Sequence, residues 1–393
     1  MSFERTFRRG DSGPVVAEIR SKLARLGLLT GAADVTSGAA GFRAAFDEAT
    51  FDEAADHAVR AFQQQRGIRV DGIVGPMTYH ALDEARWRLG DRIVFYVPAR
   101  LMAGDDVATL QQRLLDMGFD CGRVDGLFGV ETEQSLREFQ RNVGVVADGT
   151  CGPATFKALN QLSRTVVGGE PHAMRESEAI NRAGPALSGK LVIVDPGHGG
   201  GDHGVATHDL DEGELMYDLA SRVEGRLTAT GSSAFLTRGP DGAIGATGPS
   251  EADRASFANA AGADLVVSLH TEAHRNPQAS GVATYYYGND RYGHYSSLGA
   301  RIAGLVQREI CARTDLVDCR THPLNWDLLR RTRMPAVRIE VGYLTNAGDA
   351  ARLANPAFRD VVAEAVVAAV QRLYLPPDQD AQTGFLRMPA LRG

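Results

Sequence analysis

Two patterns of apolar positions divide the chain. Up to about residue 160 the apolar residues recur every three or four positions, which is typical of amphipathic helices. From residue 189 onward, helical stretches alternate with short apolar runs, of which the clearest are "LVIVDPGH" at 191–198, "DLVVSLH" at 264–270 and "AVRIEVGYLTN" at 336–346. Such alternation predicts a three-layer α/β domain with a mostly parallel sheet.

The amino-terminal part contains an internal repeat. Residues 59–82 read "VRAFQQQRGIRVDGIVGPMTYHAL" and residues 136–159 read "LREFQRNVGVVADGTCGPATFKAL", with the Phe-Gln pair and the Asp-Gly, Gly-Pro and Thr positions at one constant offset. Upstream of each copy, apolar residues with helical spacing precede the repeat. We therefore expect two small all-α modules of three helices each, at 1–87 and 100–163, the first with a loop inserted around residues 30–45.

The remaining segments have little apolar periodicity. Residues 164–188 are polar and rich in turn-forming residues, so we expect a linker, followed by the α/β domain at 189–374 and a mobile tail at 375–393. Thr383 in that tail would suit phosphorylation, which adds charge for a partner to bind. The chain is thus predicted to be multidomain.

Composition narrows the classes of function. The formal net charge is −7 and the pI about 5.8, which argues against a nucleic-acid partner. The sequence shows neither a membrane-spanning apolar run nor the apolar core of a signal peptide, so we expect a cytoplasmic protein, the alternative being export to the cell wall by another route. The four cysteines are sparse and lack a CxxC pair, which favours reduced thiols over a disulfide framework.

Candidate chemistry gathers where strands of the α/β domain end. His198 and His270 close two apolar runs, and Glu340 interrupts a third. Glu214 lies just before the apolar stripe of the first helix of this domain. Because ligands of open parallel sheets bind at the carboxyl ends of the strands, we expect these four side chains to meet. Two histidines, a carboxylate ligand and a carboxylate base are the inventory of a hydrolytic zinc site.

Each of these residues also has a structural explanation. A histidine at a strand end is often a hydrogen-bonded structural residue. Glu214 would complement a helix dipole, and Glu340 would pair with Arg338 or another basic residue. The joint placement of all four at one predicted edge is what favours a site.

Two family resemblances sharpen this interpretation. The repeat, with its phrase "FQ…G…DG..G..T…L", resembles the peptidoglycan-binding domain 1 family. If the modules bind a ligand, we expect the contacts to come from polar groups around the turns of this chain, such as Asp71 and Asp148. Residues 189 to about 374 resemble the type 3 family of zinc-dependent N-acetylmuramoyl-L-alanine amidases, through "VIVDPGHGGGDHG", "GELMYDLA", "LTR", "ADLVVSLH" and "MPAVRIEVGYLTN".

The amidase resemblance implies a cofactor, a reaction and residue roles. It implies zinc held by His198, Glu214 and His270, with Glu340 as the base that activates water. The implied reaction is hydrolysis of the amide between N-acetylmuramic acid and L-alanine of the peptidoglycan stem peptide. Glu214 is preferred over its neighbours Asp211 and Glu212 because its spacing to Leu219 and Ala220 matches the glutamate of the family.

The chain also departs from the family pattern. Glu272 stands where asparagine is usual, and His203 stands where proline is common, so His203 is interpreted as a bystander or a substrate contact, with His208 as another histidine near this turn. Two binding modules before an amidase domain without an export signal are similar to a group of actinobacterial proteins. That similarity implies an alternative function, a cytoplasmic regulator or sensor of peptidoglycan precursor synthesis, with a cell-wall synthesis protein as a possible partner.

Overall fold

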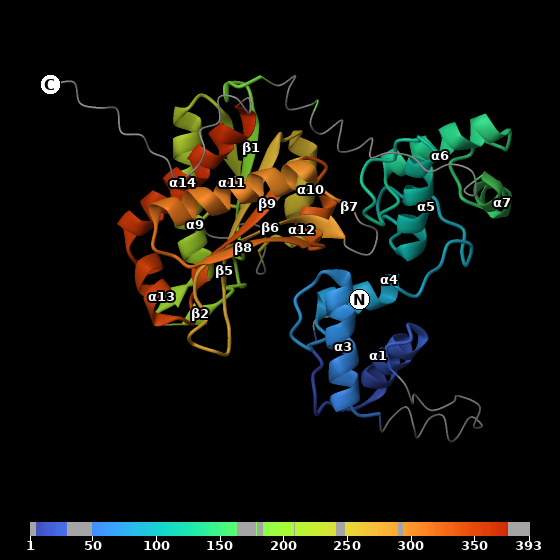
Figure 1. Ribbon diagram of the computed structural model, residues 1–393, viewed down its shortest axis with the longest axis horizontal. Coiled ribbons are helices and arrows are strands. Elements are labelled where there is room, and N and C mark those ends of the chain that lie inside the picture. Colours follow the sequence, from blue (N-terminus) through green and yellow to red (C-terminus); the bar gives the residue numbers. More distant parts are fainter. Residues whose placement is uncertain are drawn as a thin grey trace. The chain divides into compact units, whose positions relative to one another are not determined.

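The computed structural model describes residues 5–29, 49–162, 178, 184–207, 209–240, 248–289 and 294–375. The chain forms two compact units, one built from residues 1–172 with 289–294 and the other from 173–288 with 295–393 (Figure 1). The loop expected around 30–45, most of the expected linker at 164–188, His208 and the tail with Thr383 lie outside the described residues.

The first unit contains the two predicted three-helix modules. Their helices are α1 (Pro14–Arg25), α3 (Glu53–Arg66) and α4 (Pro76–Glu84), then α5 (Asp105–Asp116), α6 (Val130–Val143) and α7 (Pro153–Leu162). Phe62 and Phe139, the aromatic residues of the repeat, are fully buried in separate clusters, one for each module. Gly67 and Gly144 end the middle helices in the left-handed conformation, which a residue without Cβ adopts at little cost.

A buried glutamine fastens the turn that follows each middle helix. In the first module, Nε2 of Gln63 lies 2.8 Å from Oδ1 of Asp71 and 3.2 Å from the Thr78 hydroxyl, while its Oε1 accepts from the Gly72 amide. Gln140, Asp148, Gly149 and Thr155 repeat this arrangement in the second module. The carboxylates of Asp71 and Asp148 therefore serve their own turns.

A third copy of this arrangement lies in the first half of the second module. Gln111 of α5 donates to Oδ1 of Asp125 and to the Thr132 hydroxyl, and it accepts from the Gly126 amide. This third copy was not predicted, although "DGLFGVET" at 125–132 carries the same Asp-Gly and Thr spacing. We call the three arrangements glutamine clamps.

Replacing Gln63 by methionine should loosen the first module. The change leaves the buried amide of Gly72 without its acceptor, and each such group costs about 1–3 kcal/mol. We expect the free energy of opening of α3 and α4 to fall by about 3 kcal/mol, measured by hydrogen–deuterium exchange of their peptides. The matched control is Gln64→Met at the exposed neighbouring position; equal exchange in the two variants would contradict the clamp.

The second unit is built on one mixed sheet. Its strands are β1 (Leu191–Pro196), β4 (Ser233–Leu236), β5 (Leu265–Glu272), β6 (Val282–Asn289), β7 (His294–Tyr295), β8 (Asp318–Leu324) and β9 (Ala336–Tyr343). The strand order is β4-β1-β5-β9-β6-β7, with β8 paired to β6. The first four strands are parallel, as predicted, and β6 runs antiparallel to β9. The short strands β2 (Ala206–Thr207) and β3 (Leu210–Asp211) form a separate pair.

Helices cover both faces of this sheet (Figure 1). One face packs against α9 (Glu212–Ala229), α11 (Ser297–Arg313) and α14 (Pro356–Tyr374), and the other against α10 (Glu251–Ala261) and α12 (Asp327–Arg331). The remaining helix, α13 (Ala347–Ala354), precedes α14. The three-layer α/β architecture is therefore confirmed.

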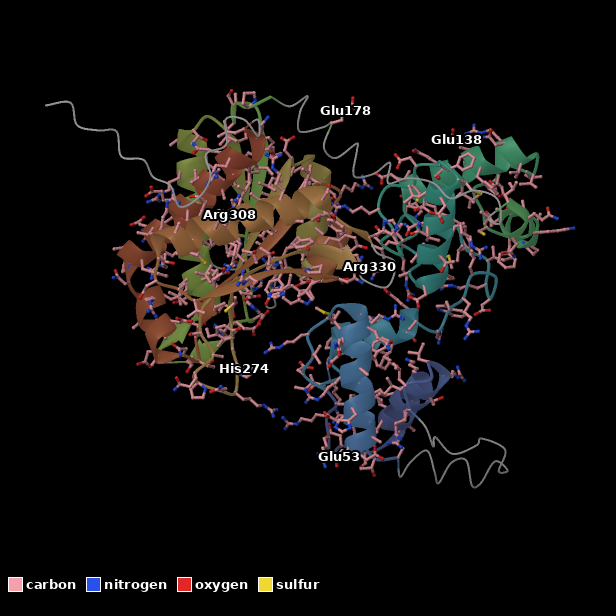
Figure 2. All side chains as sticks on the ribbon, viewed as in Figure 1. Glu53, Glu138, Glu178, His274, Arg308 and Arg330 are labelled. Atoms are coloured by element: carbon pink, nitrogen blue, oxygen red, sulfur yellow. The ribbon has the colours of Figure 1, made fainter. Side chains whose placement is uncertain are left out.

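Surface and core separate as expected for globular units. Figure 2 shows charged side chains such as Glu53, Glu138 and Arg308 projecting from the helices, and all three are exposed. All four cysteines are free thiols. Within the part of the chain that the structure describes, no helix combines the length and apolarity that a membrane crossing requires.

Candidate metal centre

His198 leaves the end of β1 in an unusual backbone conformation. Its φ is 57°, in the left-handed region that residues other than glycine seldom adopt. Two contacts hold it there: the Arg254 guanidinium donates to its carbonyl at 2.6 Å, and Oδ2 of Asp202 lies 2.8 Å from its Nδ1. With Nδ1 engaged by a carboxylate, Nε2 is the nitrogen left for a ligand or a metal.

Glu212 is the first residue of α9 and carries a fully positioned carboxylate. Its Oε2 accepts from the Val205 amide at 2.9 Å and its Oε1 from the Thr271 amide at 2.8 Å. The side chain is 1% exposed. Burial raises the pKa of Glu212, but the neighbouring imidazoles outweigh burial, and the net pKa lies well below its usual range. The group is therefore a buried carboxylate that stays ionised.

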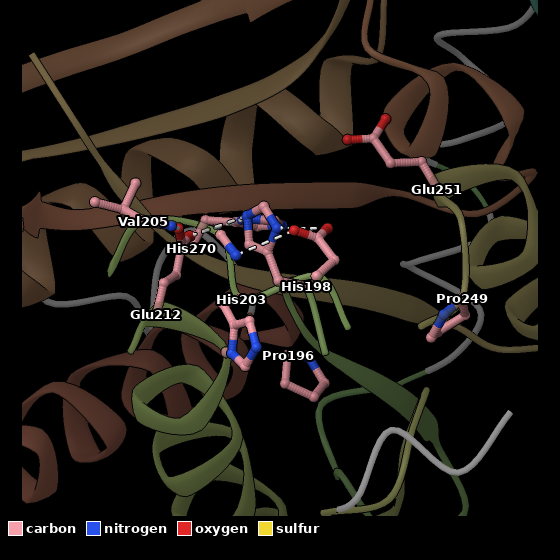
Figure 3. Close-up of polar contacts among 12 residues, drawn as sticks. Pro196, His198, His203, Val205, Glu212, Pro249, Glu251 and His270 are labelled. Carbon is pink, nitrogen blue, oxygen red and sulfur yellow. Dashed lines mark hydrogen bonds and ion pairs between the residues drawn. The ribbon is translucent and has the colours of Figure 1, made fainter. Parts of the chain in front are cut away.

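The two strand-end histidines meet at this carboxylate. Nε2 of His198 lies 3.4 Å and Nδ1 of His270 3.3 Å from Oε1 of Glu212, and the ring centroids are 5.1 Å apart. The three ligand atoms all lie within 4.8 Å of one another. Figure 3 shows these side chains pointing toward one another from the turn after β1, from α9 and from β5.

Two glycines of the stretch "DPGHGGGDHG" make room for this cluster. A Cβ on Gly197 would lie 2.3 Å from Cε1 of His270, and one on Gly204 would lie 2.5 Å from Oε2 of Glu212. Both distances are far inside van der Waals contact, so side chains at these positions would displace the site residues. The glycines are thus required by close approach, as well as by the sharp turn.

The prediction that Glu214 completes the cluster needs correction. Glu214 is exposed, whereas Glu212 is buried and lies between the two imidazoles. Asp211 caps the helix by accepting from the Glu214 amide. Because α9 begins at Glu212, its first residue faces the sheet edge, and the match of Glu214 to the family spacing does not identify the buried carboxylate. His203 is exposed and pairs with Asp211 at 2.5 Å, outside the cluster.

Glu340 lies beside His270 on the neighbouring strand. The two residues are register partners of β5 and β9, so their side chains share one face of the sheet. Oε1 of Glu340 accepts from Nε of Arg338 at 2.8 Å, as the structural explanation of this residue required. Its Oε2 is buried, and among the described residues it has no hydrogen-bond partner.

The protonation of these groups reflects their burial. Burial raises the pKa of Glu340 to about 7, partly opposed by Arg338 and supported by the negative charges of Glu272 and Glu212. Burial lowers the pKa of His270 to about 3, so this imidazole is neutral at physiological pH. For His198, burial lowers the pKa, but Glu212 and Asp202 outweigh it and the net pKa is raised.

A buried charge network supports the turn that carries His198. Asp195 accepts from Arg254 at 2.6 Å and from the hydroxyls of Thr237 and Ser268. Arg238 donates to the carbonyls of Gly197 and Gly213, which ties this turn to the start of α9. None of these supporting roles was predicted, although the motif "LTR" at 236–238 contains Thr237 and Arg238.

The donor set fits a divalent transition metal. Two imidazole nitrogens and one carboxylate oxygen are the ligands of many hydrolytic zinc sites. Nδ1 of His270 is buried and makes no hydrogen bond within the described residues. An orphaned nitrogen beside an ionised carboxylate is costly unless a cation satisfies both.

Comparison with known proteins identifies the family. Residues 192–372 match the profile described as N-acetylmuramoyl-L-alanine amidase, and residues 12–82 and 103–159 match the profile described as putative peptidoglycan binding domain. The N-acetylmuramoyl-L-alanine amidase CwlM of Mycobacterium tuberculosis is 47% identical over 382 residues, which cover 96% of this chain and 91% of that protein. The chain belongs to the N-acetylmuramoyl-L-alanine amidases.

More distant amidases match about half of this chain. The amidase LytC of Bacillus subtilis is 28% identical over 207 residues, which are 53% of this chain and 40% of that protein. Among solved structures, the amidase AmiC2 of Nostoc punctiforme is 30% identical, covers 47% of this chain and 96% of its own, and has a TM-score of 0.42. The two family profiles confirm both resemblances inferred from the motifs, while the limits set for each module and the linker stay predictions.

Proposed function

We propose that this chain hydrolyses the amide between N-acetylmuramic acid and L-alanine of peptidoglycan, with zinc held by His198, Glu212 and His270 and with Glu340 as the general base. The observation that carries the proposal is the convergence of two imidazole nitrogens, from His198 and His270, on the buried, ionised carboxylate of Glu212. Membership of the amidase family supplies the substrate class.

The residues of the site have separate roles in the proposed reaction. Zinc, when bound, would supply Lewis-acid activation of the amide carbonyl and of the attacking water. Glu340 takes the proton of that water on Oε2, the oxygen that lacks a protein partner, and passes it to the leaving amine of L-alanine. Asp202 keeps His198 oriented with Nε2 toward Glu212 throughout.

The amino-terminal modules would hold the enzyme on its polymeric substrate. Their match to the peptidoglycan-binding profile supports this role. Because Asp71 and Asp148 accept hydrogen bonds within their own turns, the glycan contacts are better sought on other surfaces of the modules.

Metal analysis together with muropeptide digestion tests the proposal. The full chain should bind zinc and release stem peptides that begin with free L-alanine. Zinc-loaded protein that releases no stem peptide would overturn the proposed hydrolysis. That result would favour the alternative of a regulator that retains the amidase fold.

The pH dependence of the reaction should reveal the base. Activity should fall as the pH drops through the pKa of Glu340, because a protonated carboxyl cannot accept the proton of water. Glu272→Gln removes a negative charge that raises this pKa, so the acidic limb of kcat/KM should move to lower pH. Glu364→Gln, at an exposed position on α14, is the control and should not move it. An unmoved limb in Glu272→Gln would contradict the assignment.

A further inference from the structure

An arginine lies against the proposed base on the same strand. Arg338 and Glu340 are two residues apart on β9, so both side chains project from one face of the sheet. Nε of Arg338 donates to Oε1 of Glu340 at 2.8 Å, and the two side chains are 15% and 4% exposed. This is a charge-assisted hydrogen bond largely removed from water, where such bonds are strong.

The arginine is itself fixed on two further sides. Its Nη1 donates to Oε1 of Glu251 at 2.9 Å, and Oε2 of Glu251 accepts from the Leu328 amide at the start of α12. The guanidinium carbon lies 4.3 Å from the centre of the Trp326 ring, which packs against Tyr285. A planar guanidinium held by two carboxylates and an aromatic face has little rotational freedom.

These contacts make the two oxygens of Glu340 inequivalent. Oε1 is bound by Arg338, while Oε2 is buried without a hydrogen-bond partner among the described residues. A carboxylate with one oxygen anchored keeps the other at a fixed position, and general-base catalysis depends on such positioning.

We propose that Arg338, braced by Glu251 and Trp326, is a positioning residue that anchors one oxygen of Glu340 and thereby directs the other toward the attacking water. The proposal rests on the proposed function, in which Glu340 is the base. Arg338 touches neither substrate nor metal in this role and acts only through Glu340.

Kinetics of Arg338→Met in the zinc-loaded full chain test the proposal. Because loss of alignment by about 1 Å costs on the order of 100-fold, we expect kcat to fall by about 30- to 100-fold. KM should stay within about 3-fold and zinc content should be unchanged, since neither depends on the orientation of the base. Arg338→Lys should restore only part of kcat, because an ammonium lacks the planar fork. A kcat within about 3-fold of the wild type would overturn the proposal.

A matched variant separates positioning from stability. Arg359 is also a mostly buried arginine of this unit. Its Nε lies 2.6 Å from Oδ2 of Asp218, and this ion pair does not involve the proposed base. Arg359→Met should lower the unfolding temperature while leaving kcat unchanged. An equal loss of kcat in the two variants would mean that Arg338 has only a structural role.

Crystal structures of the zinc-free variants give a readout that needs no activity. In Arg338→Met the Glu340 carboxylate should leave its position or occupy several rotamers, whereas in Arg359→Met it should not move. An unmoved Glu340 in both overturns the proposal.

If Arg338→Met does not fold, Glu251→Gln is the variant to use, because it removes only the contact that braces Arg338. It should lower kcat by about 3- to 10-fold; no loss there would overturn the proposal too. A wild type that binds zinc but cuts no substrate would instead contradict the proposed function.

Discussion

Replacing Glu212 by alanine should remove zinc from the protein, whereas replacing Glu214, two residues away, should not. Glu212 is buried between the imidazoles of His198 and His270, and Glu214 is exposed. Loss of an outer partner of a metal ligand already costs about 10- to 100-fold in affinity, so loss of a ligand should weaken zinc binding by more than about 100-fold. Metal analysis after dialysis, with muropeptide digestion alongside, measures the effect.

Glu214→Ala is the matched control because it changes the same helix turn by the same chemistry. Glu212→Gln is a second variant of nearly unchanged volume, which guards against a loss of zinc caused by misfolding. Retention of zinc in both Glu212 variants would contradict the proposed ligand set. Loss of zinc in Glu214→Ala would restore the interpretation made from the sequence.

Replacing Glu340 by glutamine should abolish turnover and spare the metal. The amide has nearly the shape of the carboxylate but cannot accept the proton of water, and general bases contribute about 100- to 10,000-fold to rates. We expect kcat to fall within that range while zinc content equals that of the wild type. Loss of zinc in this variant would indicate that Glu340 is a ligand, and full activity would exclude it as the base.

The strands of the parallel part of the sheet were predictable because their burial requires runs of apolar residues, which are visible in the sequence. β1, β5 and β9 are covered on both faces, so they appear as apolar runs, and the polar residues His198, His270 and Glu340 stand out against them. Parallel strands bring such residues to one edge, which is why their meeting could be anticipated. The antiparallel β6 and its partner β8 were not expected, because β6 reads "VATYYYGN" and lacks an aliphatic run, while β8 alternates between exposed and half-buried positions.

The choice between Glu212 and Glu214 could not be made from spacing. Both residues lie in the first turn of α9, and a carboxylate at either position suits a helix amino terminus. What separates them is tertiary structure: the carboxylate of Glu212 accepts from the amide of Val205, in the loop before α9, and from the amide of Thr271 on β5, 59 positions away. Hydrogen bonds from loops and neighbouring strands do not produce a periodic pattern of residues, so the sequence does not reveal them.

The arginines that hold the turn at His198 could not be predicted from the sequence for a related reason. Arg238 and Arg254 are charged residues that would ordinarily be assigned to the surface, yet both are buried and donate to backbone carbonyls of the turn. Every residue has a backbone carbonyl that can accept a hydrogen bond, so the sequence does not reveal which arginines are buried as donors to these carbonyls.

The glutamine clamps also bear on the order in which the protein acquires its structure. Gln63 and Gln140 each contact residues only 8 to 15 positions ahead, whereas the second unit depends on contacts such as Arg226 with Asp360, 134 positions apart. Local contacts close with little loss of chain entropy and speed folding. The helical modules should therefore complete their folding on the ribosome before the synthesis of β9, a central strand of the sheet and the last of the described strands in chain order.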